Sequence, residues 1–77
     1  MIQAYGRDSV LIENVECLSE SGTGQSLIVV LEEDHDEHII PKSQIHADSD
    51  IHETGDSGNL IITKWLAEKR GIWREGE

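Results

Sequence analysis

Two acidic stretches hold most of the side chains with which this chain could bind a metal. The first is an unbroken run of carboxylates and imidazoles: Glu32, Glu33, Asp34, His35, Asp36, Glu37 and His38. Divalent cations accept both kinds of ligand, but a calcium loop needs a ligand at every second position and a central glycine. The run has neither, so we predict no metal site. Its charge suits the tip of a β-hairpin, where it opposes aggregation.

The second stretch has alternating spacing, which would place its polar side chains on one side of an extended segment: His46, Asp48, Asp50, His52 and Asp56. Asp and Ser also close turns, because their side chains hydrogen-bond to the nearby backbone. The whole of 46–58 is rich in Asp, Ser, His and Gly. We therefore predict an exposed polar loop here rather than a metal site.

Three residues could act as a nucleophile beside a histidine, namely Cys17, Ser43 and Ser57. None lies in a G-x-S-x-G elbow, and Cys17 alternates with Glu16 as a core residue of a strand does. The Gly-Asp-Ser-Gly segment at 55–58 is too short for a phosphate-binding loop and lacks its lysine, so we interpret it as a tight turn. The sequence predicts no catalytic residue and no cofactor.

A small polar patch follows Pro41 and consists of Lys42, Ser43 and Gln44. Lys42 is the one basic residue between Asp8 and Thr63. Two interpretations stay open for this secondary patch. It contacts a partner, or Lys42 neutralises neighbouring carboxylates while Gln44 caps a loop.

The net charge of −10 is unevenly distributed along the chain. Between Asp8 and Thr63, thirteen acidic residues accompany one basic residue, whereas the two ends together carry five basic and three acidic residues. Direct binding of DNA or RNA depends on Lys and Arg that displace counterions from phosphates, so we do not expect it here. An anionic membrane surface is disfavoured for the same reason. The charge favours a cationic protein partner.

The pattern of apolar residues predicts five short strands, at 1–5, 10–18, 27–31, 38–45 and 59–62. In the second strand the apolar residues change parity, which indicates a β-bulge near Glu13 and Asn14. The third is apolar on both faces and is expected to be central and covered on both sides. Pro41 cannot donate to a ladder, so the fourth strand lies at an edge or bends there.

A helix is predicted after Thr63, which can cap it, and it ends at Gly71. Trp65, Leu66 and Ile72 are expected to pack this turn against the sheet. A chain of 77 residues has room for one core. We therefore predict one small acidic domain over 1–77, mainly β (α+β). Its expected form is a partly open antiparallel β-barrel or sheet of four to five strands with one C-terminal helix.

The single cysteine cannot form an internal disulfide, which favours a reducing compartment. The longest apolar run, 27–31, is too short to span a bilayer, and no signal-peptide pattern begins the chain. We expect a cytoplasmic protein, whose oligomeric state the sequence leaves open.

Three motifs carry a resemblance: Ile40 to Gln44, Gly55 to Leu60 and Trp65 to Gly71. The chain resembles a group of uncharacterised small bacteriophage proteins with the pattern I-P-K-S-Q, then G-D-x-G-x-L, then W-x-A-E-K-x-G, and the likeness runs from 27 to 71. It departs from many of them at Ile39, where they carry an aromatic residue. The resemblance implies a phage or prophage origin, a bacterial host cytoplasm and a small β-fold. It implies no reaction.

Two functions of different class follow. In the first, the chain is a non-enzymatic acidic protein that engages and inhibits a basic nucleic-acid-handling host protein, as DNA mimics and anti-CRISPR proteins do. Its predicted acidic face comprises Glu32, Glu33, Asp34, Asp36, Glu37, Asp48, Asp50 and Glu53. The alternative is an accessory module of phage replication or recombination. That module would act through its tryptophans and C-terminal cations: Trp65, Trp73, Lys64, Lys69, Arg70 and Arg74.

Overall fold

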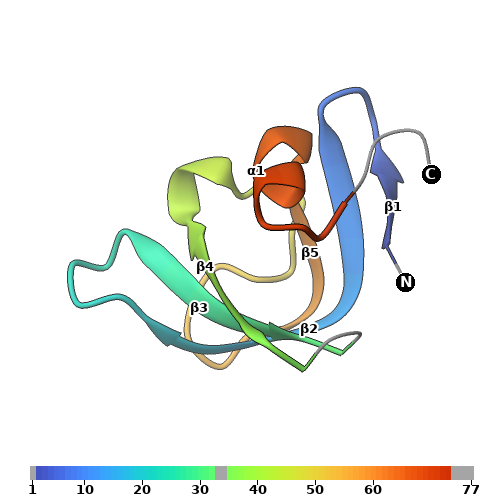
Figure 1. Cartoon of the computed structure of the whole chain (residues 1–77). Helices are drawn as coiled ribbons and strands as arrows, with labels where there is room; N and C mark the ends of the chain where they lie inside the picture. Colours follow the sequence, from blue (N-terminus) through green and yellow to red (C-terminus); the bar gives the residue numbers. More distant parts are fainter. Residues whose placement is uncertain (1, 33–34, 74–77) are drawn as a thin grey trace.

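The fold is a five-stranded antiparallel sheet with one helix near its C-terminal end (Figure 1). The structure, a computed structural model, describes residues 2–32 and 35–73. The elements in chain order are β1 (Ile2–Tyr5), β2 (Ser9–Glu20), β3 (Ser26–Leu31), β4 (Glu37–Pro41), the 3₁₀ turn η1 (Lys42–Gln44), β5 (Ser57–Thr63) and α1 (Lys64–Lys69). The predicted mainly β fold with a C-terminal helix is confirmed.

The long strand β2 organises the sheet. Its first half pairs with β1, its second half pairs with β3, and β5 pairs with both halves. The register with β5 shifts between Ile12 and Val15, where Asn14 has a φ of 60°. Asn tolerates this left-handed conformation better than most residues. The predicted bulge at Glu13 and Asn14 is therefore confirmed, and it lets one strand serve two partners on the same edge.

Alternate residues of β2 and β3 point into the core, as the period of a strand requires. The buried side chains of these two strands are Val10, Ile12, Val15, Cys17, Leu27, Val29 and Leu31. Ile28 and Val30 on the other face of β3 are only partly buried. The prediction that β3 is covered on both sides is therefore wrong. An antiparallel sheet needs a packed layer on one face only, and the second face of β3 meets solvent.

The strand β4 forms the end of the path β1-β2-β3-β4, so the predicted edge position of Pro41 is confirmed. The strand is shorter than predicted, because the chain turns into η1 directly after Pro41. Ile45 then forms an isolated bridge with Ile62 of β5. The His46 amide donates to the Ile61 carbonyl and the Asp50 amide donates to the Asn59 carbonyl, each at 2.8 Å, so the segment after η1 lies along β5. The described strands β4 and β5 do not pair with each other directly, and the sheet is therefore not closed.

The segment 46–56 is less exposed than its composition predicts, because two of its residues enter the interior. Ile51 is fully buried, and Ser49 is 6% exposed. The Ser49 hydroxyl donates to the Ile61 carbonyl at 2.9 Å and accepts from the Ile61 amide at 2.7 Å. The hydroxyl thus replaces a missing strand neighbour for β5, and the segment covers one side of the core.

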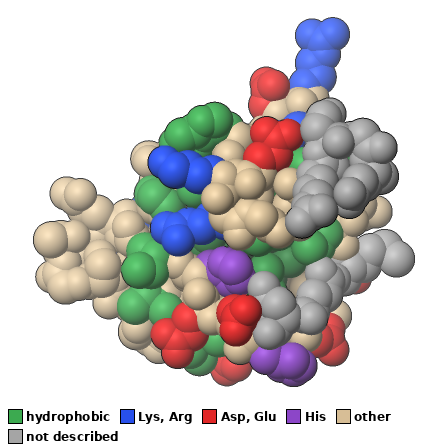
Figure 2. Space-filling model, in the orientation of Figure 1, with side chains coloured by type: hydrophobic (Ala, Val, Ile, Leu, Met, Phe, Trp, Pro, Cys, Tyr) green, Lys and Arg blue, Asp and Glu red, His purple; other side chains and the backbone are tan. Residues whose placement is uncertain are grey.

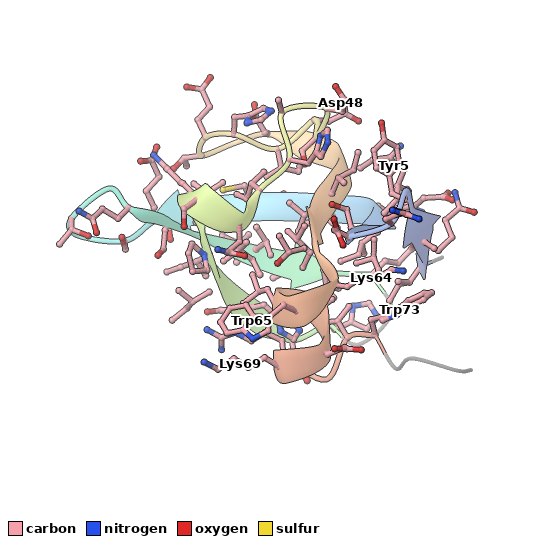
Figure 3. The ribbon with its side chains drawn as sticks, turned by 90° about the horizontal axis from the view of Figure 1, so that it is seen from above. Tyr5, Asp48, Lys64, Trp65, Lys69 and Trp73 are labelled. Carbon is pink, nitrogen blue, oxygen red and sulfur yellow. The ribbon has the colours of Figure 1, made fainter. Side chains whose placement is uncertain are left out.

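The helix α1 covers the core on the side opposite Asp48 (Figure 3). Thr63 caps it as predicted, since its hydroxyl accepts from the Leu66 amide at 3.3 Å. Leu66 and Ala67 are buried, whereas Trp65 is 60% exposed. The prediction that Trp65 packs against the sheet is wrong, because successive helical residues point about 100° apart and the inward direction belongs to Leu66 and Ala67. No helix within the described residues is long and apolar enough to cross a bilayer.

Candidate binding surface

The carboxylates at the β3–β4 turn lie at the surface. Glu32 follows the last residue of β3, and Asp36 and Glu37 lead into β4, all three exposed. Glu33 and Asp34, which belong to the predicted acidic face, lie outside the described residues. Leu31, the last residue of β3, points into the core, and Glu32 begins the turn after it with its side chain exposed.

A row of side chains continues this acidic turn across the outer face. Glu37 of β4 is opposite Val30 of β3, and Val30 is opposite Glu16 of β2. Directly opposed residues in an antiparallel pair point to the same face. Neighbouring strands are about 4.8 Å apart, so the backbones of Glu16 and Glu37 are roughly 10 Å apart. We name Glu16, Glu32, Asp36 and Glu37 the acidic band.

Sequence reasoning left Glu16 out of the acidic face. Its alternation with the buried Val15 and Cys17 indicates that it points outward, but only the strand register places it beside Glu37. Ser57 of β5 is opposite Glu16 on the other edge of β2, and the exposed Glu53 lies in the turn that precedes Ser57. Two backbone hydrogen bonds fix the turn to β2. The Cys17 amide donates to the Asp56 carbonyl at 2.9 Å, and the Cys17 carbonyl accepts from the Gly55 amide at 3.0 Å.

The other carboxylates of segment 46–56 bind donors within the protein. Asp50 accepts from the Asn59 amide at 3.0 Å, and Asp56 accepts from the amides of His52 and Glu53 at 2.9 and 3.0 Å. Asp48 accepts from the Tyr5 hydroxyl at 2.7 Å. The structure therefore brings Glu16 and Glu37 to one surface, and leaves Glu53 exposed in the turn before Ser57. The predicted face residues Asp48 and Asp50 instead accept hydrogen bonds from within the protein.

Acidic side chains dominate one part of the face drawn in Figure 2. They gather along the lower edge of the view, whereas the upper part carries basic and acidic side chains together. Within residues 2–32 and 35–73, no lysine or arginine forms an ion pair with Glu16, Glu32 or Glu37. Glu16, Glu32 and Glu37 of the acidic band therefore keep their charge available to a partner.

The secondary patch makes structural contacts. Lys42 Nζ lies 3.0 Å from Glu20 Oε2, and Gln44 Oε1 accepts from the Thr63 hydroxyl at 2.8 Å. Because the same hydroxyl caps α1, Gln44 orients the cap. These contacts support the interpretation in which Lys42 neutralises a carboxylate and Gln44 caps a neighbouring element. Ser43 is exposed.

The surface of α1 holds a second group of candidate residues. Lys69 Nζ lies 4.9 Å from the centre of the exposed Trp65 ring, within the range of a cation–π contact (Figure 3). Lys64 and Arg70 are at the two ends of the helix. Trp73 is partly buried against the core. Arg74 lies outside the described residues.

The candidate nucleophile Cys17 is 2% exposed. Burial raises the pKa of its thiol above the ordinary value of 9.0, and the thiol donates to the Ser19 carbonyl at 3.6 Å. The thiol is therefore protonated at neutral pH, and a protonated thiol is a poor nucleophile. Among residues 2–32 and 35–73, no three His, Cys, Asp or Glu side chains are grouped so as to hold a metal ion.

No protein-family model, curated protein or solved structure matches the chain. The resemblance to small bacteriophage proteins therefore stays a prediction. Any function has to be argued from the arrangement of the acidic band and of the surface of α1.

Proposed function

We propose that this chain is a non-enzymatic binding domain that uses its acidic band to engage the cationic, nucleic-acid-binding surface of another protein, and that it thereby inhibits that protein. The observation that supports this proposal is the register of the outer face. It aligns Glu16 with Glu37, and no described Lys or Arg forms an ion pair with either of these two carboxylates. A bacteriophage origin and an anti-defence or anti-CRISPR role belong to this proposal through the resemblance alone.

The physical basis is the rigidity of the charges. Glu16 on β2 and Glu37 on β4 both lie opposite Val30 of β3, so their backbones keep a fixed separation, as phosphates on a duplex do. A concentrated negative potential raises the association rate with a cationic channel and disfavours anionic competitors. A domain of this kind competes with nucleic acid for the same lysines and arginines.

The test is affinity capture from a bacterial lysate with the intact chain, followed by elution with duplex DNA or with salt. We expect nucleic-acid-binding proteins among the captured species, released by DNA and by high ionic strength, since screening weakens such contacts. The variant Glu16→Gln/Glu37→Gln should no longer capture these nucleic-acid-binding proteins.

The matched control is Asp8→Asn/Glu68→Gln, which removes the same amount of charge from two exposed positions outside the band. It should retain the capture. Equal loss in both variants would show that only the net charge matters. Capture that resists both salt and DNA would contradict the proposal.

A second candidate function is an accessory module of phage replication or recombination that binds single-stranded nucleic acid through α1. The observation that favours it is the 60% exposure of Trp65 beneath Lys69, since exposed aromatic rings with nearby cations stack on bases. Fluorescence anisotropy with a single-stranded oligonucleotide at low salt tests it. We expect Trp65→Ala to weaken binding by about fivefold to 150-fold, because one stacked base contributes about 1–3 kcal/mol. Absence of binding by the wild-type chain would dismiss this candidate.

A further inference from the structure

On the outer face of β2, β3 and β4, a second row of side chains lies beside the row formed by Glu16, Val30 and Glu37, which we name the acidic row. Ile39 of β4 is opposite Ile28 of β3, and Ile28 is opposite Ser19 of β2. The register shifts between Cys17 and Ser19, so Leu18 is an extra residue at a β-bulge beside this pair. Leu18 is 44% exposed and Ile39 is 49% exposed. We name Leu18, Ile28 and Ile39 the apolar row.

The apolar row is a contiguous feature and not a scatter of single residues. Within the described chain, the large hydrophobic side chains with high exposure are Leu18, Ile39 and Trp65. Two of these three share one face and flank the partly buried Ile28. Single exposed aliphatic residues are ordinary on protein surfaces, whereas adjacent ones rimmed by charge are typical of interaction sites.

The apolar row and the acidic row are neighbours on the same three strands. Ile28 and Val30 are two residues apart on β3, a distance of about 7 Å along the strand. Ile39 and Glu37 are likewise two residues apart on β4. An aliphatic side chain therefore lies two residues from a carboxylate on β4, at Ile39 and Glu37, and on β2, at Leu18 and Glu16. Ile28 and Val30 of β3 lie between these two pairs.

We propose that the outer face of β2–β3–β4 is where the partner docks, and that the partner is a protein segment carrying aliphatic side chains beside lysine or arginine. This inference rests on the proposed function and specifies the chemistry of its partner. Charge complementarity selects the occupant, because the carboxylates Glu16 and Glu37 favour cations and disfavour phosphates. The apolar row adds a hydrophobic contact, which a nucleic acid backbone or a hydrophilic polycation cannot make.

The two rows contribute differently to binding. Exposed charges mainly change the association rate, because they act before contact. Aliphatic anchors mainly change the dissociation rate, because their area is removed from water only in the complex. The carboxylates at the rim gain strength when the apolar centre excludes water from the interface.

The experiment uses two short synthetic peptides of equal charge, one alternating Lys with Leu and the other alternating Lys with Ser. Binding to the intact chain is measured by surface plasmon resonance and mapped by amide chemical shifts. We expect the Lys/Leu peptide to bind at least about tenfold more tightly, as burial of one aliphatic side chain allows. Its shifts should centre on Leu18, Ile28 and Ile39.

Two surface variants complete the test. Ile39→Ser should raise the dissociation rate of the Lys/Leu peptide at least about tenfold and leave the Lys/Ser peptide unaffected. Leu18→Ser provides a second variant on the same row. The control Trp65→Ser removes a more exposed hydrophobic side chain from α1 and should change the binding of neither peptide. Circular dichroism confirms that each variant is folded.

The outcomes separate this inference from the proposed function. Equal binding of both peptides through the acidic band would overturn the apolar contact and leave the proposed function standing. Shifts centred on α1, or no binding of either peptide, would overturn both. Self-association of the wild-type chain that Ile39→Ser abolishes would show that the face takes a second copy of this chain, which would also overturn the inference.

Discussion

The two acidic segments of this chain have similar compositions and different structural roles. In segment 46–56, Asp50 and Asp56 accept hydrogen bonds from backbone amides. At the β3–β4 turn, Glu32 and Glu37 are exposed, and within the described residues neither binds a lysine or arginine. The comparison shows that the availability of a carboxylate depends on the backbone donors around it and not on the local density of charge.

The physical reason lies in what each segment has to hold in place. Segment 46–56 carries the buried Ser49 and Ile51 over the core without forming a strand, so its own amides need acceptors. Asp side chains provide them at short range. The β3–β4 turn joins two strands that already pair with each other, so Glu32 and Glu37 are not needed as acceptors for its backbone.

The largest effect on segment 46–56 should come from Gly58→Ala in the neighbouring strand β5. Gly58 has a φ of +135°, and an added Cβ would lie 2.8 Å from Asp50 Oδ2 and 3.0 Å from Asp50 Cβ. The alanine would add backbone strain of about 1–3 kcal/mol and would weaken the hydrogen bond from the Asn59 amide to Asp50. Together these effects should lower the free energy of unfolding by about 3 kcal/mol. Urea denaturation measures this change.

The matched control is Gly22→Ala, where an added Cβ meets nothing within 4 Å and the φ is not in the left-handed range. It should change the free energy of unfolding by less than about 0.5 kcal/mol. If Gly58→Ala changes the free energy of unfolding as little as this control does, Asp50 is not held in place by its neighbours. The distinction between segment 46–56 and the β3–β4 turn would then not hold for Asp50.

A direct comparison of the segments removes one carboxylate from each. Asp56→Ala should lower the free energy of unfolding by about 1–2 kcal/mol, because two amide donors lose their acceptor. Glu32→Ala should change it by less than about 0.5 kcal/mol, or raise it slightly, because it relieves repulsion among like charges. Thermal and urea unfolding of both variants provide the measurement. Similar losses in the two variants would contradict the assignment.

Features governed by local rules could be predicted from the sequence. The parity change between Ile12 and Val15 indicated the bulge, and the hydroxyl of Thr63 indicated the start of α1. The edge position of β4 followed from Pro41, which lacks an amide proton. Each of these depends on one residue and its immediate neighbours.

Features that depend on strand register or on competition for the core could not be predicted. Glu16 joins the acidic band because Val30 lies between it and Glu37, a relation set by two pairings at once. Trp65 is a large hydrophobic residue and was expected in the core. It is exposed because α1 is short and Leu66 and Ala67 fill the inward side of this helix. The roles of Asp48 and Asp50 likewise required knowledge of distant donors on β1 and β5.

The smallest effect concerns Asp48, the carboxylate of segment 46–56 whose donor is a side chain of β1. Tyr5 donates to it at 2.7 Å, and this hydrogen bond raises the pKa of Tyr5 above 10.0, since it favours the neutral phenol. The chain has one tyrosine, so phenolate absorbance reports it alone. Asp48→Asn should lower the pKa of Tyr5 toward 10.0.

The sign of the linked stability follows from the raised pKa. The folded state holds the neutral phenol, so the contribution of this contact is complete below pH 10 and is lost as the pH rises through the folded pKa. Tyr5→Phe should remove that pH dependence and change the unfolding midpoint little at neutral pH, because the contact is exposed. An unchanged Tyr5 titration in Asp48→Asn would show that Asp48 is as available as Glu32, which would place it with the carboxylates of the acidic band.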